Sequence, residues 1–219
     1  MKNPTDLIDS SETTLRLVKS WIKESNNNVT LFEPDLSMNP TILSNYQVTT
    51  KSVLGTIIYY TGGLLIEDGW LRLLGSNSKL MGRNIYEWNK LNIYYPKSIL
   101  VADDVIGGFF ALNGGDIGEN LRNIYYFAPD TLEWEDMEMK YSDFIHWLCS
   151  DDINSFYLNF QWANWREEVK STEGNKGILI YPFLWAEGEE IDFRKRSIIP
   201  IRELWELNIS NKMKLDGHL

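Results

Sequence analysis

The chain has 219 residues, of which 43% are hydrophobic and 24% charged, the balance of an ordinary globular protein. Its length is enough to bury a core without disulfides, and Cys149 is the only cysteine, as expected in a reducing compartment. A net charge of −10 disfavours nucleic acid and anionic membranes and favours a basic partner, although solubility alone also explains such a charge. The sequence has no signal peptide and no membrane-length apolar run, so a cytoplasmic protein is predicted.

The N-terminal quarter of the chain predicts two helices separated by a short strand. Apolar residues at helical spacing predict a helix over residues 10–25. Residues 29–32 then predict a strand. Residues 51–61 are rich in β-branched side chains, but they keep helical spacing and two glycines follow them, so we predict a buried helix.

Three consecutive hairpins are predicted next. In the first, Asp68-Gly69 suits a two-residue turn with positive φ at both positions, and in that register Leu65 faces Arg72. Turn residues also separate the strands of the other two hairpins. The predicted strand pairs are residues 64–67 with 70–73, 98–103 with 107–113, and 123–128 with 131–137.

Helical spacing returns after the hairpins. Apolar residues predict helices that begin near Tyr141 and near Ile153. Residues 177–185 predict a further strand, and Pro200 is typical of the first turn of a final helix.

The order of these elements predicts the fold class. Hairpins followed by helices favour an α+β protein with a mainly antiparallel sheet and helices packed on one face of it. We expect one domain over residues 1–219, with a core over residues 29–170. A strand and helix then form a C-terminal extension over residues 177–210.

The usual catalytic and metal-binding patterns are missing. His146 and Cys149 lie three residues apart on a predicted helix, but the other histidine is His218 at the tail, so a zinc site would lack ligands. No orienting motif makes Cys149 a nucleophile. Residues 114–118 are glycine-rich but precede neither a helix nor a lysine, which predicts a hairpin loop rather than a phosphate cradle. We therefore predict no catalytic residue, metal or cofactor.

Two acidic clusters are candidates for binding a basic partner. One lies along the second strand of the third hairpin and the other in a turn of the C-terminal extension. Solvation is the ordinary explanation for such clusters, and partner contact is the functional one. The candidate residues are Glu133, Glu135, Asp136, Glu138, Glu187, Glu189 and Glu190.

A pocket is the alternative site. Trp70, Arg72, Asp103 and Asp104 are expected close to the hairpin loops, where converging polar groups would suit a small-ligand binder or an enzyme. The paired aspartates also have an ordinary explanation, because carboxylates in turns often accept backbone hydrogen bonds.

Three segments of the chain closely resemble an uncharacterised bacterial family defined only as a domain of unknown function. They read QVTTKSVLGTIIYYTGGLLIEDGWLRLLG at residues 47–75, ILVADDVIGGFFALNGG at residues 99–115 and NIYYFAPDTLEWED at residues 123–136. The likeness extends over roughly residues 29–210 and implies no established activity.

The chain also resembles the core of the SUKH superfamily. The shared features are a helix, two glycines and a strand, then the hairpin VADDVIGGFFAL, a strand pair and the helix YSDFIHWL. Many members are immunity proteins that neutralise toxins, often nucleases, by direct binding. The resemblance therefore implies a non-enzymatic binding protein with a SUKH-like core and a partner such as a basic toxin. The C-terminal part from about Gly177 onward departs from that pattern.

Overall fold

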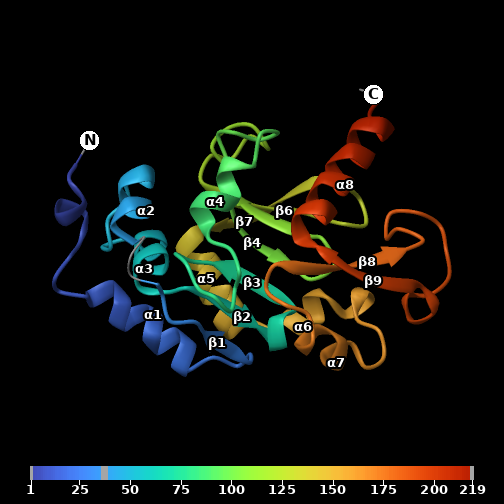
Figure 1. The fold of residues 1–219 in the computed structure, drawn as a ribbon, viewed down its shortest axis with the longest axis horizontal. Coiled ribbons are helices and arrows are strands. Elements are labelled where there is room, and N and C mark those ends of the chain that lie inside the picture. The colour runs from blue at the N-terminus through green and yellow to red at the C-terminus, as the bar shows by residue number, and fades with distance from the viewer. Residues whose placement is uncertain (1, 36–38, 218–219) are drawn as a thin grey trace.

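The computed structural model describes residues 2–35 and 39–217 and has an α+β fold around a seven-stranded antiparallel sheet (Figure 1). Each strand pairs with the next one along the chain, so the predicted class and the antiparallel sheet are confirmed. The glycine-rich residues 114–118 connect the fifth strand to the sixth. The strands are β1 (Val29–Leu31), β2 (Gly63–Ile66), β3 (Leu71–Leu74), β4 (Ile99–Asp104), β5 (Phe109–Leu112), β6 (Asn123–Phe127) and β7 (Trp134–Lys140).

The helices and a second, two-stranded sheet surround this meander. The second sheet pairs β8 with β9, and the residue pattern predicts neither β9 nor α2. No helix within the described ranges has both the length and the apolar character needed to cross a membrane. The remaining elements are α1 (Thr13–Lys23), α2 (Asn39–Tyr46), α3 (Val53–Tyr60), α4 (Ile85–Lys90), α5 (Tyr141–Ser150), α6 (Ile153–Phe156), α7 (Trp165–Lys170), β8 (Lys176–Tyr181), β9 (Lys195–Pro200) and α8 (Ile201–Leu215).

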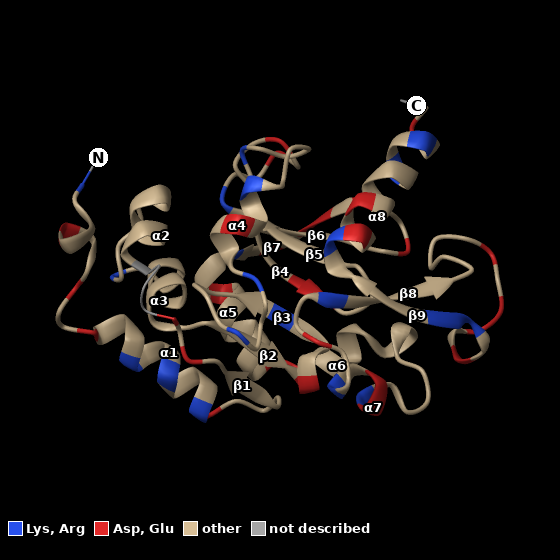
Figure 2. Ribbon diagram, in the orientation of Figure 1, with Lys and Arg blue, Asp and Glu red and all other residues tan. Residues whose placement is uncertain are grey.

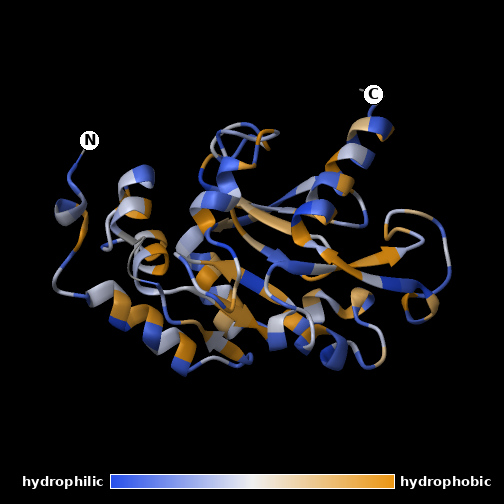
Figure 3. Ribbon diagram, viewed as in Figure 1, coloured by the Kyte–Doolittle hydropathy of each residue, from blue (hydrophilic) through white to orange (hydrophobic). Residues whose placement is uncertain are grey.

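Helices cover both faces of the seven-stranded sheet, so the expectation of helices on one face was wrong. Neighbouring strand residues point to opposite faces. The Phe109 ring packs edge-on against Trp205 of α8 and stacks on Trp88 of α4, with centroid distances of 4.7 and 6.5 Å. The Phe110 ring lies 5.0 Å from Phe144 of α5. β5 is therefore covered on both sides, which explains why all four of its residues are apolar, whereas β3 and β4 also carry charged residues (Figure 3).

The first hairpin has the predicted strands but a different turn. Leu65 pairs with Arg72 as predicted. The connection is longer than two residues, because residues 67–69 form a short 3-10 turn with positive φ at all three positions. The Glu67 side chain is buried and accepts a hydrogen bond of 2.6 Å from Arg166. This distant contact holds the turn in a geometry that Asp68-Gly69 does not predict by itself.

The C-terminal extension is attached to the turn between β4 and β5. The Ile178 N–H at the start of β8 donates to the carbonyl of Val105 at 2.6 Å. The Asn208 side chain of α8 donates to the carbonyl of Gly107 at 2.9 Å. Gly107 has a φ of +94°, and a Cβ there would meet Leu204 at 2.8 Å, so only glycine fits this close approach.

Candidate functional site

The four residues expected to line a pocket lie together in the core instead. Trp70, Arg72, Asp103 and Asp104 are each at most 2% exposed. Arg72 and Asp103 are cross-strand partners on β3 and β4, and the Arg72 Nε donates to Asp103 Oδ1 at 2.8 Å. The Trp70 ring is enclosed by other aromatic rings, including that of Tyr157 at 5.4 Å. Packed side chains thus fill the position where a pocket was expected.

A second arginine completes this buried cluster. Arg83 Nη1 and Nη2 donate to the two carboxylate oxygens of Asp103 at 2.5 and 2.9 Å. Its Nε donates to the carbonyl of Gly174, and Arg72 donates to the carbonyls of Lys176 and Asp104. The cluster therefore joins the central sheet to the chain entering β8. The sequence does not indicate a role for Arg83, because it is an isolated arginine in a loop with no pattern around it.

Asp104 shapes the turn between β4 and β5. Its Oδ1 accepts hydrogen bonds from the N–H groups of Ile106 and Gly108, at 3.1 and 2.7 Å. Its Oδ2 accepts one from the Tyr126 hydroxyl at 2.7 Å. Burial raises the pKa of Asp104 to about 6, and these hydrogen bonds oppose the shift. Its contacts are those of a carboxylate that accepts hydrogen bonds within a turn.

The raised pKa of Asp104 predicts a specific pH dependence of stability. The folded state binds this proton more tightly than the unfolded state, so the contribution is favourable near pH 4 and is lost as the pH rises to about 6. The substitution D104N keeps an acceptor for both N–H groups and supplies a donor to Tyr126. The difference in unfolding free energy between the wild type and D104N should therefore change by about 1–3 kcal/mol between pH 4 and 7. Urea unfolding at several pH values measures it, and a pH-independent difference would contradict the assignment.

His146 and Cys149 do not form a reactive pair. Cys149 is buried, and that burial raises the pKa of its thiol to about 11. The His146 ring packs edge-on against Trp21, and its Nδ1 lies 3.1 Å from the Ser150 hydroxyl. His218 lies outside the described residues. Within those residues, no three His, Cys, Asp or Glu side chains gather as potential metal ligands.

Cys149 should therefore react slowly in the folded protein. With a pKa of about 11, roughly one thiol in ten thousand is ionised at pH 7, and only the thiolate is nucleophilic. We expect a disulfide reagent such as 5,5′-dithiobis(2-nitrobenzoate) to label the native protein far more slowly than the urea-unfolded chain. Equal labelling rates in the two states would show that the thiol is accessible and ionised in the fold.

The first acidic cluster lies on the edge of the seven-stranded sheet. Glu135 and Glu138 are exposed on β7, the terminal strand. Glu133, just before β7, is exposed and pairs with Lys212 of α8 at 2.6 Å. Asp136 is half-buried and accepts hydrogen bonds from Asn120 and Asn123, so it holds the neighbouring loop. Of this cluster, the glutamates are therefore better placed than Asp136 for contact with a partner.

The second acidic cluster lies in the loop that joins β8 to β9, at the right of Figure 2. Glu187, Glu189 and Glu190 are exposed, and their carboxylates have no ion pair within the described chain. The same hairpin exposes two large aromatic side chains, Tyr181 at 58% and Phe193 at 70%. Charge and exposed aromatic surface therefore occur on one projecting element.

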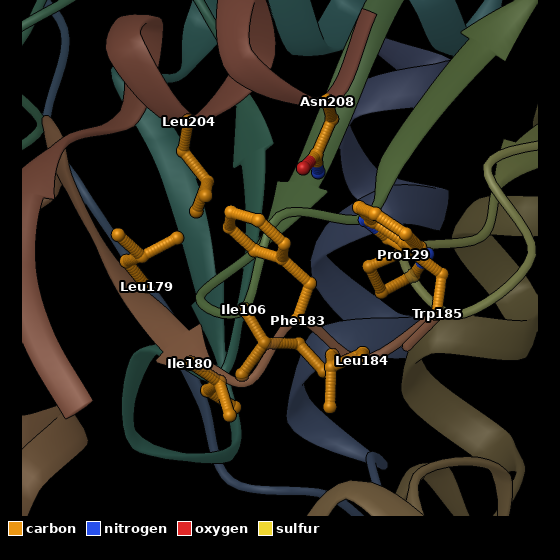
Figure 4. Close-up of a pocket in the computed structure, with 9 residues that line it drawn as sticks. All are labelled: Ile106, Pro129, Leu179, Ile180, Phe183, Leu184, Trp185, Leu204 and Asn208. Atoms are coloured by element: carbon orange, nitrogen blue, oxygen red, sulfur yellow. The ribbon is translucent and has the colours of Figure 1, made fainter. Parts of the chain in front are cut away.

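A small apolar hollow lies between the turn before β7 and the β8–β9 loop, the two segments next to the acidic clusters. Pro129, in the turn before β7, lines this hollow together with Phe183, Leu184 and Trp185 of the β8–β9 loop (Figure 4). The hollow has a volume of about 10 Å³, which is room for about one water molecule. It is too small for a ligand. The packing around it holds the loop that carries Glu187 beside the turn that precedes β7.

These features define an acidic α+β protein with exposed glutamates at β7 and in the β8–β9 loop. The chain belongs to the family described as protein of unknown function DUF2625, whose model matches residues 5–204. It is 38% identical over 213 residues to the protein YbfG of Escherichia coli (strain K12), which covers 97% of this chain and 98% of that protein. An uncharacterized protein of Haemophilus influenzae is 37% identical over 205 residues, or 91% of this chain and 90% of the relative. No solved structure matches the chain significantly.

Proposed function

We propose that this protein is a non-enzymatic, cytoplasmic binding protein of the immunity type, which neutralises a basic partner such as a nuclease toxin. The observation that carries the proposal is the set of exposed carboxylates of the β8–β9 loop beside the exposed rings of Tyr181 and Phe193. Carboxylates accelerate the encounter with a basic protein, and large aromatic side chains provide the contacts that hold a complex.

Two further points support the proposal. The resemblance to the SUKH core implies toxin binding. The alternative pocket at Trp70, Arg72, Asp103 and Asp104 has less support, because all four side chains are buried and the three charged ones are hydrogen-bonded within the core. A surface interaction therefore fits the predicted residues better than chemistry on a small molecule.

Reversing the charge of the β8–β9 loop should weaken binding selectively. The variant E187K/E189K/E190K changes the net charge by +6, from −10 to −4. We expect it to lose the basic partner that the tagged wild type captures from its native host at low salt, with an affinity lower by about tenfold or more. Capture followed by mass spectrometry, and then titration of the purified partner, measures this loss.

A matched variant separates the position of the charge from its amount. E12K/E24K/E173K makes the same +6 change at exposed glutamates outside the two acidic clusters. It should still capture the partner, with only the smaller decrease in affinity that a less negative net charge causes. Equal loss in both variants would mean that net charge alone attracts the partner, and this would contradict a specific acidic surface.

A further inference from the structure

A cleft of about 360 Å³ lies between α4 and α8, at a position separate from the acidic clusters. Four parts of the chain line it: the loop between β3 and α4, α4 itself, the segment before β8 and the first turn of α8. Its volume lies within the range of small-molecule sites, about 300–1,000 Å³. Walls contributed by four distant segments form a concave site rather than a gap beside one element.

Two arginines line this cleft, and each of them already binds a carboxylate. Arg83 lines it and is held by both oxygens of Asp103, with its side chain only 7% exposed. Arg202 also lines it, with its side chain 53% exposed and its Nε donating to Glu206 at 2.7 Å. The first turn of α8, which has 15 residues, begins at Ile201 in the wall and adds partial positive charge. Glu87 is the one acidic residue among those lining the cleft.

The wall of the cleft also contains an aromatic and an apolar side chain. Trp88 is 7% exposed, and its indole N–H is buried without a partner in the described structure. The Arg83 guanidinium lies 5.0 Å from the centre of the Trp88 ring. Leu91 adds apolar surface, and Asn77 adds an amide group.

We propose that this cleft binds a small organic anion. Its carboxylate or phosphate group lies between Arg202 and the first turn of α8, and its apolar body lies against Leu91 and the small exposed part of Trp88. Arg83 forms a fixed part of the wall, because Asp103 and the Gly174 carbonyl already hold its guanidinium. The site is independent of the acidic surface, so a failure of either proposal leaves the other standing.

The test follows the indole N–H signal of Trp88 in a ¹H–¹⁵N NMR spectrum, which the substitution W88F identifies by its disappearance. Adenosine 5′-monophosphate and benzoate are the probes, one a phosphate and the other a carboxylate, each attached to a ring. We expect a saturable shift of the Trp88 signal with at least one probe. The variant R202A should bind that probe about tenfold more weakly, the effect of losing one charge-assisted contact.

The control is R122A, which removes an exposed arginine outside the cleft and should leave the affinity unchanged. R202K should keep part of the affinity, because it retains the charge but loses the planar guanidinium. Two results would overturn the proposal: no saturable shift with either probe in the wild type, or equal affinity in R202A and the wild type. The dispersion of the same spectra reports whether each variant is folded.

Discussion

Asp103→Ala is expected to lower the free energy of unfolding by about 3–5 kcal/mol, since it leaves two buried guanidinium groups without their carboxylate. Arg72 and Arg83 both bind Asp103, and their side chains are 2% and 7% exposed. Such a loss is a large part of the about 5–15 kcal/mol that stabilises an ordinary domain. Urea unfolding followed by circular dichroism measures it.

The exposed residue Glu203 supplies the control for that experiment. Glu203→Ala should change stability by no more than about 0.5 kcal/mol, as exposed substitutions without partners usually do. Amide hydrogen exchange adds a local measurement, because both arginines bind carbonyls of residues 174–176. Protection in β8 should fall in D103A more than protection in β1. A loss below about 1 kcal/mol would show that the cluster contributes little to holding the extension.

Trp205→Ala should cost a similar amount, about 3–5 kcal/mol, because it removes the ring by which α8 covers the sheet. The Trp205 side chain is 3% exposed and packs edge-on against Phe109 and Phe127, at 4.7 and 5.8 Å. Trp205→Phe keeps an aromatic ring there and should cost clearly less. Thermal and urea unfolding of both variants measure the difference.

The same experiment addresses the predicted domain organisation. If the extension folds with the core as one domain, W205A should unfold in a single transition at lower denaturant concentration, and all spectroscopic probes should coincide. Two separate transitions, with the sheet unfolding as in the wild type, would contradict the single-domain prediction. The loss of unfolding free energy in W205A would then reflect destabilisation of α8 and the β8–β9 hairpin alone.

Local signals in the sequence were sufficient where neighbouring residues determine the structure. The helix from Tyr141 was predicted because Phe144 and Leu148 repeat at helical spacing, and the strands of the hairpins follow from apolar runs between turn residues. Even the pairing of Leu65 with Arg72 follows from the short connection. These elements need no knowledge of distant contacts.

Long-range contacts determine the features of the fold that the local residue pattern does not predict. The turn at Glu67 depends on Arg166, 99 residues further along the chain. The continuous apolar stretch around Phe109 and Phe110 indicates a strand buried on both faces. It does not indicate that α8 is one of the helices that cover these faces. The short strand β9 includes several exposed residues and has no clear alternation, so periodicity does not reveal it.

Some features of the candidate site also follow from local sequence, whereas others depend on tertiary contacts. Exposure of the glutamates on β7 and in the β8–β9 loop follows from their charge and their place in edge and turn segments. The contact region of Pro129 and Trp185, which places these segments side by side, is a tertiary feature. Equally, Arg72 and Asp103 were expected close together, but their burial depends on Arg83 and on the chain entering β8.

The most direct test of partner binding is capture from the native host at low salt, with elution by increasing salt. A basic protein should leave the tagged wild type as the salt rises, because screening weakens contacts between exposed charges. The same protein should be missing from the E187K/E189K/E190K eluate and present with E12K/E24K/E173K. Recovery of no basic protein, under growth conditions that include those in which the neighbouring genes are expressed, would contradict the proposed immunity function.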